Sequence, residues 1–418
     1  MMNRIKVQSV IITDNKVDIS YIAEGKCREY LNFDEATFWI EYSIPIKNIP
    51  VSIAVIPFCA NVLPLVWLLD ATLEVPELDF AFYNSIEEFK KGYIKMYPTL
   101  DFAGKVQVGH LVNHNYDIQD QSAVFFSGGV DAFSTLIAHI EESPILLTLW
   151  GADVKHEDIG GWKMVSNHIV NTALEWDLET CFIKTNFRKI VLETALDQLV
   201  KKAGYGYWYG FQHGIGIISH AAPIAFTRKI RMVYLASSYT KGGQIACASS
   251  PTIDNFFRIS SCQVRNDQSD WTRQDKIINI CNYVKEKGKH VQLRVCWESE
   301  GGGNCCHCEK CYRTIFGILA EGENPLEYGF SYTYNDFQNI CKDIRTKLIF
   351  NDVYIELWKN IQDRFIANKY LLKDKSEIDW IYSYNFEHIN RTFYKSTIIL
   401  LHKIHHFMSH VKAQLWRK

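Results

Sequence analysis

The chain lacks a surplus of charge of either sign. Its 45 Lys and Arg residues against 47 Asp and Glu residues give a formal net charge of −2. A protein that binds nucleic acid through the phosphate backbone usually carries a basic excess, so the bulk charge does not indicate such a partner. The start of the chain also lacks a basic segment followed by an apolar run and a small-residue cleavage site. We therefore expect no signal peptide and a cytoplasmic protein.

One long stretch has no charged residue at all. It covers residues 48–69 (NIPVSIAVIPFCANVLPLVWLL), which is 22 residues and long enough to span a bilayer. Pro50, Pro57 and Pro64 recur every seven residues within it, and each removes a backbone donor that lipid cannot replace. We expect buried short strands and turns here rather than a transmembrane helix.

The 12 cysteines are not spread along the chain as a disulfide framework would be. Five of them lie between residues 296 and 311, and clustered thiols in an unsecreted protein indicate a metal site. Cys296, Cys305, Cys308 and Cys311 have the spacing Cys-x8-Cys-x2-Cys-x2-Cys, which fills four tetrahedral positions and favours structural zinc. An iron–sulfur cluster and unligated thiols are the alternatives. Cys306 and His307 are interpreted as bystanders, with Cys306 in place of a neighbouring ligand as the alternative.

Internal repeats and low-complexity linkers are also absent, but the pattern changes near residue 119. Residues 1–118 are rich in strand formers, with a hairpin expected in VQSVIITDNKVDISYIAEG, and are interpreted as an accessory domain. Residues 119–330 alternate apolar strands with amphipathic helices, which is typical of a parallel sheet with helices on both faces. Residues 331–418 have helical periodicity.

The alternation predicts specific elements. Strands are expected at 123–126, 144–151, 181–186, 231–238 and 290–295. Helices are expected after the first strand and near 162–175, 188–202, 211–226 and 272–285. Thr272 and Asp275 resemble a capping box at the start of the last helix.

The first central strand ends on Ser127-Gly128-Gly129-Val130-Asp131 and a helix follows. A helix N-terminus exposes backbone N–H groups and the positive end of the helix dipole, and glycines allow a phosphate to approach the backbone closely. Ser127 could add a hydroxyl, and Asp131 could bind Mg²⁺. A tight turn without a ligand is the alternative. The glycines are not followed by Gly-Lys-Ser/Thr, which excludes a Walker loop.

The string FFSGGVDAFSTL (125–136) resembles the PP-loop of the N-type ATP pyrophosphatases, whose pattern is Ser-Gly-Gly-x-Asp-Ser. This resemblance implies that the loop binds the β- and γ-phosphates of ATP. It also implies cleavage between the α- and β-phosphates, with transfer of AMP and release of pyrophosphate. Ala132 replaces the last Ser of the pattern, and Ser134 or Thr135 in the next turn would have to supply the missing hydroxyl.

The loop and the cysteines together resemble 7-cyano-7-deazaguanine synthase over residues 119–325. Cys306 stands where that family has a glycine, and Arg313 follows the fourth cysteine. The resemblance implies that a substrate carboxylate attacks the α-phosphorus, that ammonia displaces AMP to give an amide, and that a second ATP converts the amide to a nitrile. Candidate cations for the leaving pyrophosphate are Arg273, Lys276, Lys310 and Arg313.

Three further segments bear on a site of this type. Residues 185–188 (TNFR) and 237–243 (SSYTKGG) follow strands at the end where open α/β sheets bind ligands. Residues 208–214 (WYGFQHG) could add stacking surface or belong to the core. No general base can be named from the sequence.

Two other functions remain open. A tRNA-modifying PP-loop enzyme would need a basic surface, which only residues 402–418 (HKIHHFMSHVKAQLWRK) suggest. A non-catalytic module that binds nucleotide, zinc and a partner would explain Ala132. The identity of the carboxylate and the oligomeric state cannot be read from the sequence.

Overall fold

The computed structural model describes residues 2–35, 37–114, 119–238, 247–296, 302–372 and 376–387. The chain forms two compact units, Met1–Trp271 and Thr272–Lys418. The sequence analysis instead places boundaries near residues 118 and 330. The strands of the first unit explain the difference at residue 118.

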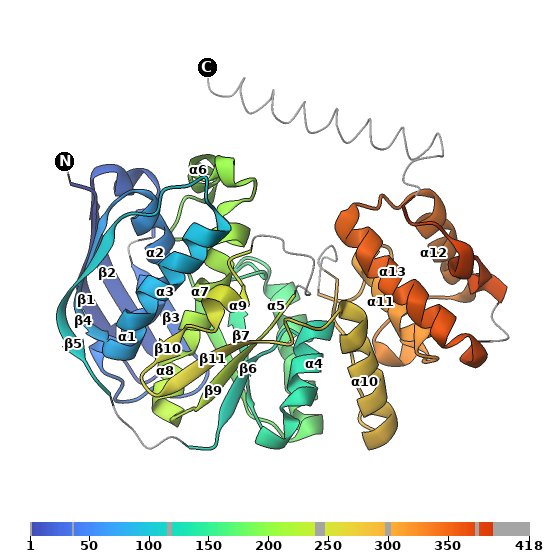
Figure 1. Cartoon of the computed structure of the whole chain (residues 1–418). Helices are drawn as coiled ribbons and strands as arrows, with labels where there is room; N and C mark the ends of the chain where they lie inside the picture. The colour runs from blue at the N-terminus through green and yellow to red at the C-terminus, as the bar shows by residue number, and fades with distance from the viewer. Residues whose placement is uncertain are drawn as a thin grey trace. The chain divides into compact units, whose positions relative to one another are not determined.

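The first unit contains one sheet of 11 strands in the order β10-β11-β9-β6-β7-β8-β3-β2-β1-β4-β5 (Figure 1). The strands are β1 Arg4–Ile12, β2 Lys16–Glu24, β3 Phe38–Tyr42, β4 Thr72–Asp79, β5 Lys105–Val112, β6 Ser122–Phe125, β7 Ile145–Trp150, β8 Thr180–Thr185, β9 Met232–Ala236, β10 Arg258–Ile259 and β11 Cys262–Asp267.

Strands β11, β9, β6, β7 and β8 are parallel to one another. The sheet continues past β8 because β3 pairs with it in antiparallel register, Ile40 opposite Thr185 and Tyr42 opposite Ile183. The strands before residue 118 thus cover an edge of the parallel half and extend its sheet. This pairing is why they do not fold as a separate domain.

Helices pack on the sheet of this unit. They are α1 Val51–Ala54, α2 Ile56–Leu68, α3 Phe80–Met96, α4 Val130–Ala138, α5 Ile159–Trp176, α6 Glu193–Leu199, α7 His213–Ile218, α8 Ala222–Arg228 and α9 Pro251–Asp254. Helix α4 contacts β6 and β9, α5 contacts β7 and β8, and α9 contacts β11. The α/β architecture with a largely parallel sheet and flanking helices is confirmed.

The uncharged stretch 48–69 forms α1 and α2, so the prediction of short strands and turns is wrong. Proline is compatible with the first turn of a helix, where Pro57 lies, because the N–H groups there have no helical partner. Pro64 lies inside α2, where the surrounding core encloses the helix. Among the described residues, none of the helices has the length and apolar character needed to cross a membrane.

The second unit is built on α10 Arg273–Lys287, α11 Glu309–Ala320, α12 Tyr334–Thr346 and α13 Asp352–Ala367. The predicted capping box of Thr272 and Asp275 is confirmed at the start of α10. The strand expected at 290–295 is wrong. This segment pairs with no strand among the residues that the structure describes, and the N–H of Leu293 donates to the carbonyl of Tyr328 at 2.9 Å. The basic tail 402–418 lies outside the described residues.

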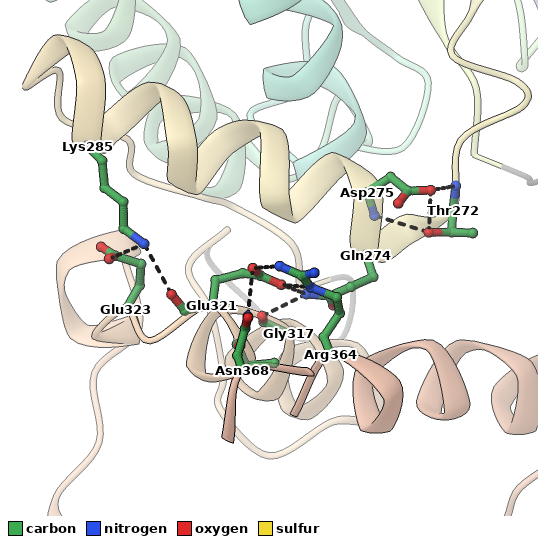
Figure 2. Close-up of polar contacts among 10 residues, drawn as sticks. Thr272, Gln274, Asp275, Lys285, Gly317, Glu321, Glu323, Arg364 and Asn368 are labelled. Atoms are coloured by element: carbon green, nitrogen blue, oxygen red, sulfur yellow. Dashed lines mark hydrogen bonds and ion pairs between the residues drawn. The ribbon is translucent and has the colours of Figure 1, made fainter. Parts of the chain in front are cut away.

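Glu321, at the end of α11, joins three helices of this unit (Figure 2). Its Oε1 accepts hydrogen bonds from Gln274 Nε2 at 2.8 Å and from Arg364 Nε at 2.8 Å, and Nη2 of Arg364 pairs with Oε2 at 2.5 Å. Asn368 Nδ2 also donates to Oε2, at 3.3 Å. The side chain of Glu321 is only 6% exposed, so these donors compensate the charge that burial removes from water.

Candidate functional site

The loop Ser127–Asp131 lies where the order of the parallel strands reverses. Strand β6, which precedes the loop, pairs with β7 on one side and with β9 on the other. The chain runs from β6 through β7 to β8 and only then reaches β9 on the opposite side of β6. Open α/β sheets bind ligands outside the carboxyl ends of the strands at such a reversal. The loop therefore lies at the position of this sheet best suited to a ligand.

The backbone of the loop suits an anion. Gly128 has φ of 76°, in the left-handed region that glycine adopts at little cost. Gly129 is the N-cap of α4, and no side chain caps the helix. The first N–H groups and the dipole of α4 are thus directed to the carboxyl edge of the sheet. Asp131 lies in this first turn, where its carboxylate would repel a phosphate unless a cation such as Mg²⁺ lay between them.

The next turn of α4 faces inward. Ala132, which stands in place of the pattern's last Ser, is buried, and so are Ser134 and Thr135. The carbonyl of Ser134 accepts a 3.2 Å hydrogen bond from Nε2 of Gln268, which ties α4 to the segment after β11. Both hydroxyl residues are thus enclosed by the packing around α4, and a contact of either hydroxyl with a phosphate stays a prediction.

The four predicted cysteines come together in the second unit. Their Sγ atoms all lie within 4.8 Å of one another, with Cys296 and Cys308 at 3.8 Å and Cys305 and Cys311 at 3.9 Å. Four sulfurs at about 2.3 Å from one zinc ion would lie roughly 3.8 Å apart. The tetra-cysteine site is therefore compatible with zinc.

The same distances bear on two other arrangements. A disulfide needs about 2.05 Å between sulfurs, so these thiols are not bridged. An iron–sulfur cluster places several irons and bridging sulfides between its cysteines, so sulfurs this close together favour a single metal ion. Hydrogen bonding with Cys311 lowers the pKa of the Cys308 thiol, whereas burial raises the pKa of Cys305.

Asn304 organises this cluster, and the sequence analysis missed it. Its Oδ1 accepts from the N–H groups of Val295 at 2.9 Å and Cys296 at 3.3 Å. Its Nδ2 donates to the carbonyls of Leu293 and Gly329, both at 2.8 Å. One amide side chain thus holds the distant first cysteine against the other three. Its position directly before the Cys-Cys pair was the only available signal.

Cys306 is a buried bystander with an unusual backbone. Its φ of 57° lies in the left-handed region, where glycine is favoured and other residues are strained. A glycine would adopt this backbone conformation at less cost. Its Sγ contacts the carbonyl of Asn304 at 3.8 Å.

The four candidate cations lie on two helices, Arg273 and Lys276 on α10 and Lys310 and Arg313 on α11. Arg313 Nη2 pairs with Glu309 Oε2 at 3.3 Å, and Trp358 Nε1 donates to Oε1 of the same carboxylate at 3.0 Å. Burial raises the pKa of Glu309, although Arg313 and Arg273 oppose this shift. Lys276 is buried on α10 and Lys310 is half-buried on α11. All four lie in the second unit, whereas Ser127–Asp131 lies in the first.

The remaining predicted segments have mixed positions. Residues 185–188 lie at the end of β8, on the carboxyl edge of the sheet. Of the segment 237–243, the structure describes residues 237 and 238, and the N–H of Ser237 donates to the carbonyl of Asp267 at 3.0 Å. Residues 208–212 form a π-helical turn. Within it Phe211 is buried and stacks on Tyr97, so this aromatic belongs to the core.

The chain matches no protein-family model and no curated protein.

Proposed function

We propose that this chain is an ATP-dependent enzyme of the PP-loop type, which adenylates a substrate carboxylate, releases pyrophosphate and transfers the acyl group to ammonia to form an amide. The observation that carries the proposal is the position of Ser127–Asp131 at the reversal of the parallel strand order. The N-terminus of α4, which no side chain caps, supports it, because backbone N–H donors and the helix dipole stabilise phosphate charge.

In this proposal each loop residue has a separate task. The N–H groups around Gly128 and Gly129 bind the pyrophosphate that leaves, and the hydroxyl of Ser127 adds a donor. Asp131 binds the Mg²⁺ that neutralises the phosphates. Since the carboxylate and ATP are both anions, the enzyme contributes mainly by holding them together and stabilising the developing charge. Whether the amide is then dehydrated to a nitrile by a second ATP depends on the acid.

The zinc has a structural task in the proposal. Four cysteine ligands leave no open coordination position for substrate or water. The ion would hold the start of α11 against the segment that contains Cys296.

Pyrophosphate release tests the proposal directly. Zinc-replete full-length protein is incubated with MgATP and a panel of carboxylic acids, and acid-dependent pyrophosphate and AMP are the expected products. Asp131→Asn is expected to reduce the rate at least 100-fold, because the metal ligand at the phosphates is lost. Asp177→Asn is the matched control, since Asp177 is an exposed C-cap residue of α5.

A non-catalytic nucleotide-binding module is the second candidate, and the buried Ala132 favours it. Calorimetry distinguishes the two. Binding of ATP that is recovered intact after long incubation with every acid would support the module and overturn the enzyme, whereas no binding of ATP would overturn both.

A further inference from the structure

A second group of polar side chains lies at the carboxyl edge of the parallel sheet, beside the end of β8. Arg188, three residues past β8, stacks its guanidinium on the ring of Trp208, 4.2 Å from the ring centroid. Trp208 in turn lies edge-on to His213, with 5.1 Å between ring centroids. Because β6, β7 and β8 are parallel neighbours about 5 Å apart, this group shares its edge with Ser127–Asp131.

The backbone that carries His213 is irregular. Trp208–Gln212 form a π-helical turn, and α7 begins at His213. Single π turns are rare and occur frequently at functional sites, because the extra residue redirects a side chain. The buried amide of Gln212 holds this turn by donating to Oδ1 of Asn61 at 2.9 Å and to the carbonyl of Phe187 at 3.2 Å.

The imidazole of His213 has an unmet hydrogen-bonding requirement. Its Nδ1 is buried and has no hydrogen-bond partner in the part of the chain that the structure describes. His220, one helix further on, is the contrasting case: its Nδ1 and Nε2 bond to the carbonyl of Gly216 at 2.7 Å and to Oγ1 of Thr185 at 3.1 Å. His220 is a core histidine whose bonds are complete. A buried nitrogen without a partner is costly, and a ligand is one way to supply the partner.

The charges around His213 keep the ring available as an acceptor. Burial lowers its pKa, and Arg188 acts in the same direction, while Asp153 after β7 opposes them. Arg188 is itself held in place, since Nη2 pairs with Glu193 at 2.7 Å and Nη1 donates to the carbonyl of Ala152 at 3.0 Å. A neutral imidazole with an available lone pair can accept a proton from a reacting nitrogen and pass it on at once.

We propose that Nδ1 of His213 accepts the proton of the nitrogen nucleophile in the acyl-transfer step, as the general base of the site. This inference rests on the proposed function. Ammonia attacks the acyl carbon of the adenylate, a C–N bond forms, and the C–O bond to AMP breaks with its electron pair passing to the phosphate. The nitrogen loses a proton to His213, which returns it to solvent. The products are the amide, AMP and one proton, with no change of oxidation state.

A general base for the nitrogen nucleophile acts in acyl transfer and not in adenylation, so the test measures both half-reactions. The full-length zinc-replete protein is used with an acid that supports ATP–pyrophosphate exchange, and amide formation is followed with ammonium chloride or with hydroxylamine. Hydroxylamine is largely unprotonated at neutral pH and depends less on a base than ammonium does. For His213→Gln we expect exchange within twofold of wild type, an ammonia-dependent rate at least 100-fold lower at pH 7, and a hydroxylamine-dependent rate less than about tenfold lower. The ammonia deficit should shrink as the pH rises toward 10.

His220→Gln is the matched control for a buried histidine of structural importance. It is expected to lower the thermal unfolding temperature but to leave the ratio of ammonia-dependent to hydroxylamine-dependent rates unchanged. A loss of exchange and of both nucleophile reactions in parallel in His213→Gln, or no loss at all, would overturn the inference and leave the proposed function standing. If no acid supports exchange in the wild type, the proposed function and this inference both fail.

Discussion

Sγ of Cys296 lies 3.8 Å from Sγ of Cys308, although twelve positions separate them along the chain. Asn304 supports this contact, because its amide accepts from the N–H of Val295 and donates to the carbonyl of Leu293 in the segment that leads to Cys296. The geometry required for a tetrahedral ion is therefore built into backbone hydrogen bonds as well as into the thiols. Metal binding and folding of the second unit are expected to be coupled.

Replacing one ligand should reveal this coupling. Cys308→Ala removes one of four thiolates, and structural zinc contributes on the order of 10 kcal/mol of folding free energy. We expect the second unit of this variant to unfold or aggregate, with less than one zinc per chain by elemental analysis. Cys306→Ala is the control, since Cys306 is a buried neighbour outside the four-sulfur cluster. It should retain one zinc per chain. A full zinc content in Cys308→Ala would contradict the assignment of ligands.

The second unit should also depend on Glu321. Glu321→Gln removes the charge that pairs with Arg364 and weakens the bonds from Gln274 and Asn368. Because Arg364 is one third exposed and keeps access to water, we expect a loss of roughly 2–3 kcal/mol rather than the larger cost of a fully buried orphan charge. Urea unfolding followed by circular dichroism measures the change.

Glu387→Gln provides the comparison for this variant. Glu387 pairs with Lys359 at the surface, where both side chains are about half exposed. Exposed pairs contribute less than about 1 kcal/mol, so the free energy of unfolding should stay within about 0.5 kcal/mol of wild type. Equal losses in the two variants would show that burial of Glu321 has no special importance.

His139 should make the stability of the first unit depend on pH. Burial lowers the pKa of His139, but its hydrogen bonds to Asp267 Oδ1 at 3.2 Å and Glu142 Oε1 at 3.1 Å outweigh burial and raise the pKa above the ordinary value. The protonated ring is thus favoured in the folded state. The protonated ring contributes fully to the free energy of unfolding below about pH 6.5, the pKa of a histidine in the unfolded chain. This contribution is lost as the pH rises through the pKa of His139 in the folded protein.

His139→Gln isolates this contribution. The variant should be less stable than wild type by about 1–2 kcal/mol at pH 6, and the difference should shrink by pH 9. Between these pH values Glu142 stays ionised, because its hydrogen bonds outweigh burial and lower its pKa. Thermal unfolding across this range measures the difference. A difference in stability between variant and wild type that grows as the pH rises would contradict this explanation.

Elements that depend on neighbouring residues could be predicted from the sequence, whereas pairings between distant residues could not. The strand before Ser127, the helix after it and the capping box of Thr272 depend on neighbouring residues, and the sequence analysis predicted them correctly. The pairing of Ile40 with Thr185 joins residues far apart in the chain, and no local pattern indicates it. Because of this pairing, the strands of residues 1–118, which the sequence pattern assigns to an accessory domain, belong to the main sheet.

The same reasoning applies to the apolar segments and the candidate site. Spacing alone identified the four cysteines, because metal geometry restricts it, whereas Asn304 acts through contacts with distant carbonyls. The prolines of the apolar segment 48–69 predict short strands and turns, yet the tertiary core accommodates Pro64 inside α2. Likewise, His213 could not be recognised, since its unmet hydrogen bond is visible only once the residues around it are placed.

Gly128 provides the most direct test of the loop itself. Its φ of 76° is in the left-handed region, so Gly128→Ala should cost about 1 kcal/mol of stability and place a methyl group where a phosphate would approach. Gly204→Ala is the control, because Gly204 has a similar φ of 81° and no atom lies within 4 Å of an added Cβ. This variant therefore has the same backbone cost at a position far from the loop in sequence. Both variants should lose similar stability in urea, but only Gly128→Ala should lose affinity for MgATP, by at least tenfold in calorimetry. Equal affinities in the two variants would show that the nucleotide does not contact this loop.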